Sequence, residues 1–176
     1  MVIMKKIVTI LAIVFAVVIL GVYAIDWSNP SINIDGMKVQ GPAEFRGDIV
    51  EGLDLLREKA PEHYAMVVGN IRKVYLTEDD FNGWRLDKTF SFSKAAYENR
   101  ISQGPHKVYH IALDLVHEGR HAQRCNDGEN TYDAPTEEWL AVETEKEVAK
   151  LIDAPQEIKD WLETVYETRW WEEEKP

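Results

Sequence analysis

Apolar residues recur every three or four positions between residues 108 and 123, which predicts an amphipathic helix. The members of this stripe are Val108, Ile111, Ala112, Leu115 and Val116. The same period predicts further helices over residues 42–59, 135–152 and 156–171, with prolines close to their ends. The second half of the chain is therefore expected to be helical.

Apolar and polar residues alternate instead in the first half of the chain, which predicts strands. Residues 31–40 alternate on either side of Asp35-Gly36, a pair typical of a two-residue hairpin turn. Residues 64–68 and 71–76 are rich in β-branched and aromatic residues, and residues 86–92 alternate again. We expect an α+β fold, in which a small mixed or antiparallel sheet packs against the central helix and two C-terminal helices.

The N-terminal region carries an uncharged apolar run over residues 7–25, preceded by Lys5 and Lys6. Its length is close to the roughly 20 residues that span a bilayer. Because positive residues stay in the cytoplasm, residues 26–176 are expected to form a single domain outside it. A cleaved signal peptide is the alternative; its apolar core is usually about 7–15 residues, so the longer run favours a retained transmembrane helix.

The net charge of the chain bears on which kinds of partner it can bind. The chain has 20 Lys and Arg against 31 Asp and Glu, a net charge of −11. Nucleic-acid binding needs clustered basic residues, so no nucleic-acid partner is expected. The single cysteine, Cys125, excludes a disulfide within the chain.

The helix over residues 108–123 contains the sequence His117-Glu118-Gly119-Arg120-His121. Residues four apart share one face of a helix, so two imidazoles can bind one zinc ion. Glu118 is rotated by about 100° from His117 and can take a proton from a zinc-bound water. This is the His-Glu-x-x-His pattern of zinc metallopeptidases.

A catalytic zinc ion needs a third protein ligand. Over residues 108–152 the chain resembles the gluzincin zinc metallopeptidases, in which a glutamate on the next helix completes the site. The resemblance implies a zincin-like fold, His117 and His121 as ligands, Glu118 as general base, and a third ligand among Glu143, Glu145 and Glu147. We select Glu143, which lies 22 residues after His121 and leaves Glu147 one turn further on to brace a ligand histidine.

A second interpretation places the third ligand at Asp127, ten residues after His117, as in the metzincin group. The glycine expected there, three residues past the second histidine, is replaced by Arg124.

The sequence thus predicts a membrane-tethered zinc metallopeptidase that acts on a peptide or protein. Tyr132, Arg120 and Tyr166 are candidates for stabilising the oxyanion. Residues 86–92 could supply the sheet edge along which a peptide lies. The alternative is a non-catalytic zinc-binding or partner-binding module on a zincin-like scaffold.

Overall fold

The computed structural model describes residues 30–78, 83–85, 87–98, 104, 106–131 and 133–168. All of these residues except Pro30 belong to the unit Ser31–Pro176. The predicted transmembrane helix over residues 7–25 lies outside the described residues. Within the described ranges, no helix combines the length and the apolar character needed to cross a membrane.

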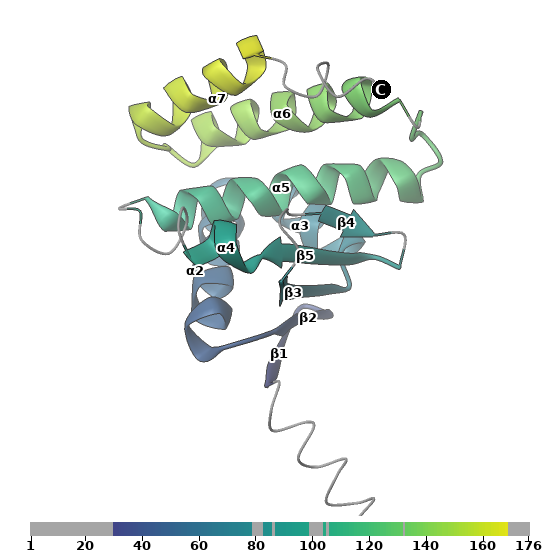
Figure 1. Ribbon diagram of the computed structural model, residues 1–176, viewed down its shortest axis with the longest axis vertical. Helices are drawn as coiled ribbons and strands as arrows, with labels where there is room; N and C mark the ends of the chain where they lie inside the picture. The colour runs from purple at the N-terminus through teal and green to yellow at the C-terminus, as the bar shows by residue number, and fades with distance from the viewer. Residues whose placement is uncertain are drawn as a thin grey trace, which may run out of the picture. The chain divides into compact units, whose positions relative to one another are not determined.

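Five strands form one mixed sheet with the order β1-β2-β3-β5-β4 (Figure 1). The strands are β1 (Ser31–Ile34), β2 (Met37–Gln40), β3 (Lys73–Thr77), β4 (Gly83–Arg85) and β5 (Thr89–Ser93). The outer pairs β1–β2 and β4–β5 are antiparallel, whereas β2–β3 and β3–β5 are parallel. The predicted α+β class with a small mixed sheet is therefore confirmed.

The predicted hairpin at Asp35-Gly36 is confirmed by the turn between β1 and β2. Asp35 and Gly36 both have positive φ angles, of 46° and 93°. Such a pair matches the right-handed twist of the two strands. The side-chain oxygen of Asn33 accepts a hydrogen bond from the backbone N–H of Gly36 at 3.1 Å, which stabilises the turn.

Residues 86–92 do not form a sheet edge. Strand β5 lies inside the sheet and pairs with β3 on one side and β4 on the other. Phe90 and Phe92 are fully buried, as their alternation required, but Ser91 on the opposite face is also buried. The outer strand on this side of the sheet is the short strand β4, which precedes β5 in the chain.

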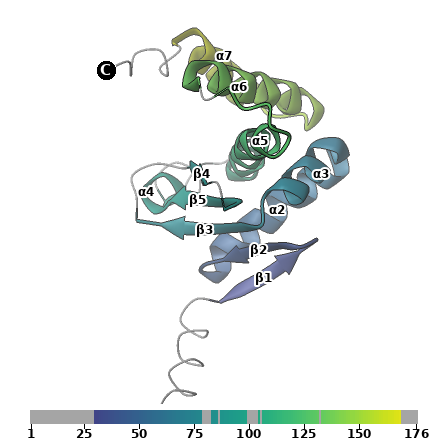
Figure 2. The same ribbon diagram turned by 90° about the vertical axis from the view of Figure 1, so that its right-hand side faces the viewer.

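The main helices are α2 (Ala43–Lys59), α3 (Pro61–Asn70), α5 (Lys107–Asn126), α6 (Ala134–Leu151) and α7 (Gln156–Thr168), with a short α4 (Lys94–Ala96) after β5. Helix α5 lies between α6 and the sheet, and it contacts α2, α3, α6 and β4 (Figures 1 and 2). The helices predicted over 42–59, 108–123 and 135–152 are confirmed. The helix predicted over 156–171 is present as far as Thr168, and its remaining residues lie outside the described part.

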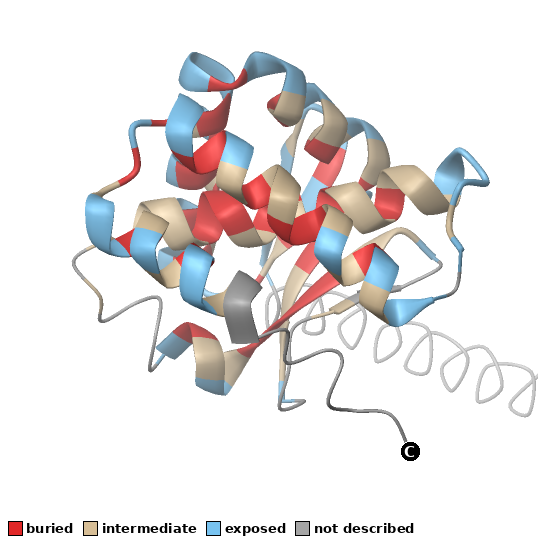
Figure 3. Ribbon diagram, turned by 90° about the horizontal axis from the view of Figure 1, so that it is seen from above, coloured by how far each residue is buried: buried red, intermediate tan, exposed pale blue. Residues whose placement is uncertain are grey.

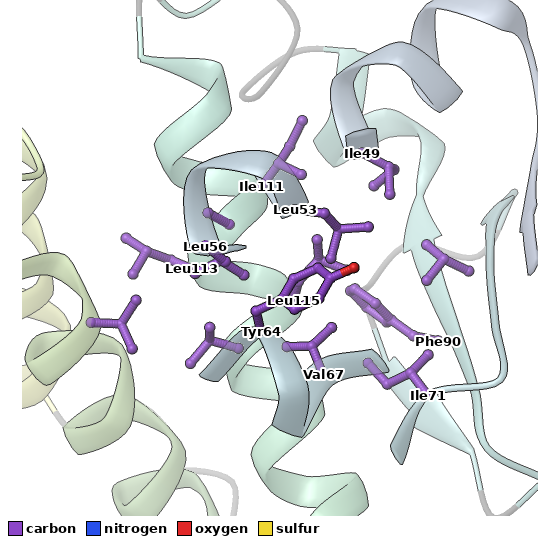
Figure 4. Packing of buried hydrophobic residues seen from close by; sticks show 14 of the residues in the cluster. Ile49, Leu53, Leu56, Tyr64, Val67, Ile71, Phe90, Ile111, Leu113 and Leu115 are labelled. Carbon is purple, nitrogen blue, oxygen red and sulfur yellow. The ribbon is translucent and has the colours of Figure 1, made fainter. Parts of the chain in front are cut away.

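The strand predicted over residues 64–68 is wrong, because this segment belongs to helix α3. Pro61 occupies the start of the helix, where its fixed φ angle is favourable. Tyr64, Val67 and Ile71 are buried at helical spacing, and Figure 4 shows Tyr64 and Val67 beside Leu115 of α5 and Ile71 beside Phe90. Packing of this face outweighs the strand preference of the two valines at 67 and 68.

The hydrophobic core is built around α5, whose Ile111, Leu113 and Leu115 are all buried (Figure 4). Buried residues concentrate where the helices cover the sheet, and exposed residues lie on the outer turns (Figure 3). Helix α2 approaches α5 closely at Gly52, where an added Cβ would lie 2.9 Å from Cγ2 of Ile111 and 3.3 Å from the backbone nitrogen of Ala112. This close approach fixes the position of α5 against α2.

The two glycines of α2 provide a test of that packing. Gly47→Ala meets no atom within 4 Å and is expected to raise the free energy of unfolding by about 0.5–1 kcal/mol through helix propensity. Gly52→Ala gains the same propensity but forces α2 away from α5, and overpacking costs about 1–3 kcal/mol. Denaturant unfolding should therefore place Gly52→Ala below the wild type. Equal stability of the two variants would show that the contact at Gly52 is not tight.

Candidate metal centre

Helix α5 presents His117 and His121 on the same face, as the four-residue spacing predicted. The two rings lie edge to face, with centroids 4.8 Å apart. Their Nε2 atoms are separated by 3.1 Å. Both side chains are largely buried, with exposed fractions of 17% and 14%. The pair therefore directs two nitrogen atoms to one point beside the helix.

Glu138 of helix α6 completes the group. Its Oε2 lies 3.2 Å from Nε2 of His117, and its Oε1 lies 3.3 Å from Nε2 of His121. Among the described residues, His117, His121 and Glu138 are the group whose ligand atoms could hold a metal ion. The carboxylate thus reaches both imidazoles from the neighbouring helix.

The separations among these ligand atoms fit a tetrahedral ion. Zinc binds histidine nitrogen and carboxylate oxygen at about 2.0–2.2 Å, so two ligand atoms at the tetrahedral angle lie about 3.3–3.6 Å apart. The nitrogen–nitrogen distance of 3.1 Å and the nitrogen–oxygen distances of 3.2 and 3.3 Å, which end on different oxygens of Glu138, are within a few tenths of an ångström of that range. Two imidazoles and one carboxylate are also a donor set that zinc accepts.

Glu145 holds His117 from the opposite side of the ring. Its Oε2 lies 3.2 Å from Nδ1 of His117, and its side chain is only 6% exposed. A carboxylate at Nδ1 favours the tautomer that carries the proton on that nitrogen, which leaves the Nε2 lone pair for a metal. The brace that the sequence analysis placed at Glu147 is therefore supplied by Glu145.

Glu118 is buried next to this group, with an exposed fraction of 8%. Burial raises the pKa of its carboxyl group, while the positive charges of His117 and His121 lower it, and the net shift is upward. A carboxylate with a raised pKa is a better proton acceptor near neutral pH. Glu118 thus has the burial and the basicity that the proposed proton transfer requires.

The charges of the cluster are strongly coupled. Burial alone would lower the pKa of His117, but the carboxylates of Glu145 and Glu138 outweigh burial and raise it well above its usual value. Burial would likewise raise the pKa of Glu138, yet hydrogen bonds from His117 and His121 lower it. Without a metal the cluster therefore favours the protonated form of His117, and a metal ion that bound its Nε2 would have to displace that proton.

Glu143 does not reach the histidines. Its Oε1 lies 3.5 Å from Nζ of Lys146, its side chain is 42% exposed, and it lines a surface hollow of about 420 Å³ together with Glu147. Each residue turns a helix by about 100°. Glu143, five residues after Glu138, therefore points about 140° away from it, whereas Glu145, seven residues after Glu138, points within about 20° of the same direction. The structure thus brings Glu138, and not Glu143, to the two histidines.

The other candidates lie elsewhere. Asp127 is exposed at the C-terminal end of α5, and its backbone N–H bonds to the carbonyl of Gln123 at 2.9 Å. Arg120 donates to Oε1 of Gln123 at 2.8 Å and borders the same surface hollow as Glu143. Tyr132 and the side chain of Tyr166 are outside the described part of the chain. The described residues thus do not bring an oxyanion-stabilising side chain to the metal group.

Glu137, the neighbour of Glu138, is an ionised partner of Arg124. A hydrogen bond from the Arg124 side chain lowers the pKa of Glu137, burial opposes this shift, and hydrogen bonds from Thr131 add to it, so that the pKa is about 2. Nothing in the spacing of the motif had pointed to this pair. It lies at the junction of the two helices that carry the metal-binding side chains.

No protein-family model matches the chain, and neither the curated proteins nor the solved structures contain a significant match.

Substitution of two glutamates on α6 distinguishes the observed third position from the predicted one. Glu138→Gln should weaken zinc binding by more than about 100-fold, because outer-shell changes alone cost about 10–100-fold. Glu143→Gln should bind zinc like the wild type, because its carboxylate faces Lys146. Zinc affinity is measured by competition with a chromophoric chelator at constant pH. A loss of affinity in Glu143→Gln with none in Glu138→Gln would contradict the arrangement.

Proposed function

We propose that this protein is a zinc-dependent metallopeptidase, with His117, His121 and Glu138 as zinc ligands and Glu118 as general base. The observation that carries the proposal is the convergence of His117, His121 and Glu138 beside a buried glutamate: the two Nε2 atoms are 3.1 Å apart, and each lies 3.2–3.3 Å from one of the two Glu138 oxygens. Three protein ligands leave one coordination position for water or substrate. A zinc ion bound there supplies Lewis acidity, which lowers the pKa of water to about 7 and polarises a carbonyl group.

Glu118 is the residue that gives the centre a catalytic rather than a structural character. A purely structural zinc site has four protein ligands and no use for an adjacent free carboxylate. The Glu118 carboxylate lies outside the ligand group, is buried, and has a raised pKa. In the proposed reaction it accepts a proton from the attacking water and passes it to the leaving amine of the peptide.

The sheet edge at β4 supports a peptide as the substrate. Strand β4 contacts α5, the helix that carries the motif, and pairs with β5 on one side. Its other side meets no strand among the described residues. An extended peptide can add to such an edge through its backbone hydrogen-bonding groups. This edge replaces residues 86–92 in the proposed substrate interaction.

Exchange of Glu118 tests the proposed function. Glu118→Gln should keep the zinc affinity of the wild type, because the side chain is not a ligand. Its peptidase activity should fall by about 10²–10⁴-fold, the usual contribution of a general base. Zinc content and hydrolysis of a broad peptide library are measured on the same samples. Zinc binding without hydrolysis in the wild type would favour the non-catalytic module, and a wild type that binds no zinc would leave only a structural role.

We also propose that residues 7–25 tether the domain to a membrane, with residues 26–176 on the extracytoplasmic side. The full chain should then sediment with membranes and resist extraction by alkaline carbonate, and external protease should degrade the domain in intact cells. A chain that starts at Asp26 should stay in the supernatant. Recovery of the full-length chain in the soluble fraction would contradict the tether, and a shortened soluble chain would indicate cleavage of a signal peptide.

A further inference from the structure

A buried guanidinium–carboxylate pair joins the two helices that carry the candidate metal ligands. Arg124 follows His121 by three residues on α5, and Glu137 directly precedes Glu138 on α6. Nε of Arg124 lies 2.8 Å from Oε2 of Glu137, and Nη2 lies 3.2 Å from Oε1. The two side chains are 12% and 6% exposed. Two parallel contacts of this kind fix both the separation and the relative orientation of their helices.

The loop between α5 and α6 is tied to the same pair. Nη2 of Arg124 also donates to the backbone carbonyl of Glu129 at 2.7 Å. The backbone N–H and the hydroxyl group of Thr131 both donate to Oε1 of Glu137, each at 2.9 Å. Arg124 and Glu137 therefore join the two helices and also fix the loop between them, Arg124 through Glu129 and Glu137 through Thr131.

Glu138 depends on this support because it lies near the start of α6. The helix begins at Ala134, and its N-cap residue Asp133 makes no side-chain capping hydrogen bond. The first N–H groups of a helix lack partners within the helix, so an uncapped first turn tends to fray. Glu138 nevertheless has to place its two oxygens 3.2 and 3.3 Å from two different imidazoles. The fixed position of its neighbour Glu137 supplies the missing constraint.

We propose that Arg124 and Glu137 are positioning residues that set Glu138 against His117 and His121, and thereby determine the metal affinity and coordination geometry of the centre. Neither residue belongs to the group of ligand atoms itself. The inference rests on the proposed function, in that the centre binds zinc. It adds a requirement that the motif does not contain, because the ion pair lies outside the five residues 117–121.

The test compares Arg124→Gln, Glu137→Gln and the milder Arg124→Lys with a matched control, Lys107→Gln. The control breaks another ion pair of α5, in which Nζ of Lys107 lies 2.7 Å from Oδ1 of Asp48; the Lys107 side chain is 32% exposed and the Asp48 side chain 5%. Zinc affinity is measured by chelator competition on the full-length chain in detergent. The absorption spectrum of the cobalt-substituted protein reports the coordination geometry, and circular dichroism of the metal-free protein reports folding.

Arg124→Gln and Glu137→Gln should weaken zinc binding by about 10–100-fold, the usual effect of losing support behind a ligand. The cobalt spectrum should change in shape, since Glu138 no longer binds in one fixed position. Arg124→Lys should lie between these variants and the wild type, because lysine keeps the charge but cannot make the two parallel contacts. Lys107→Gln should keep the affinity and the spectrum of the wild type even where it lowers stability.

The outcomes separate this inference from the proposed function. Wild-type zinc affinity and an unchanged cobalt spectrum in the folded Arg124 and Glu137 variants would overturn the positioning role and leave the metal centre intact. A wild-type chain that binds neither zinc nor cobalt would remove both. If the two glutamine variants do not fold, Arg124→Lys decides: a native circular dichroism spectrum with wild-type affinity and cobalt spectrum overturns the proposal, and weakened affinity supports it.

Discussion

The burial of carboxylates against imidazoles between α5 and α6 is the interaction on which the described centre depends. Glu118, Glu138 and Glu145 are all removed from most of the solvent, and an isolated buried charge is strongly destabilising. The positive charge that compensates them can come from a proton on His117 or from a metal ion. The imidazole nitrogens and the Glu138 oxygens lie 3.1–3.3 Å apart, so a divalent cation could replace that proton with small adjustments of the side chains.

Close packing fixes the helix that presents the histidines. Gly119, inside the motif, faces α3, where an added Cβ would lie 3.1 Å from Cγ2 and 3.4 Å from Cα of Val67. Gly52 provides the corresponding close approach on α2. Gly119 thus serves the packing of α5 against α3. Because the core holds α5 from two sides, the geometry of the group formed by His117, His121 and Glu138 depends on where α6 lies against α5.

The sequence predicted the parts of the structure that depend on local spacing. The helical period, the Asp35-Gly36 turn and the shared face of His117 and His121 each follow from residues a few positions apart. The segment over 64–68 was wrong because tertiary packing of Tyr64 and Val67 decided between two plausible local structures. The structure places Glu143 away from the histidines for a similar reason, since spacing along the chain does not say which side of α6 faces α5.

A signal for Glu138 was nevertheless present in the sequence. Glu138 and Glu145 are seven residues apart and share the helical phase of the buried residues Ala141, Val148 and Ile152. Two acidic residues on an otherwise apolar face predict that the face meets basic or metal-binding side chains, because unpaired buried carboxylates are costly. A search for acidic residues on the buried face of the helix selects Glu138 and Glu145 without any assumption about how many residues separate them from His121.

The arrangement also determines which part of the molecule metal binding stabilises. The candidate ligands come from α5 and α6, whereas α2, α3 and the sheet hold α5 through apolar contacts. A ligand that binds only the folded state stabilises it by an amount that grows with its concentration relative to its dissociation constant. Here that stabilisation acts on the contact between α5 and α6, where the buried groups are charged. Apolar residues of α6 such as Val148 and Ala149 already belong to the core, and a metal ion bound between α5 and α6 would add to the stability of that interface.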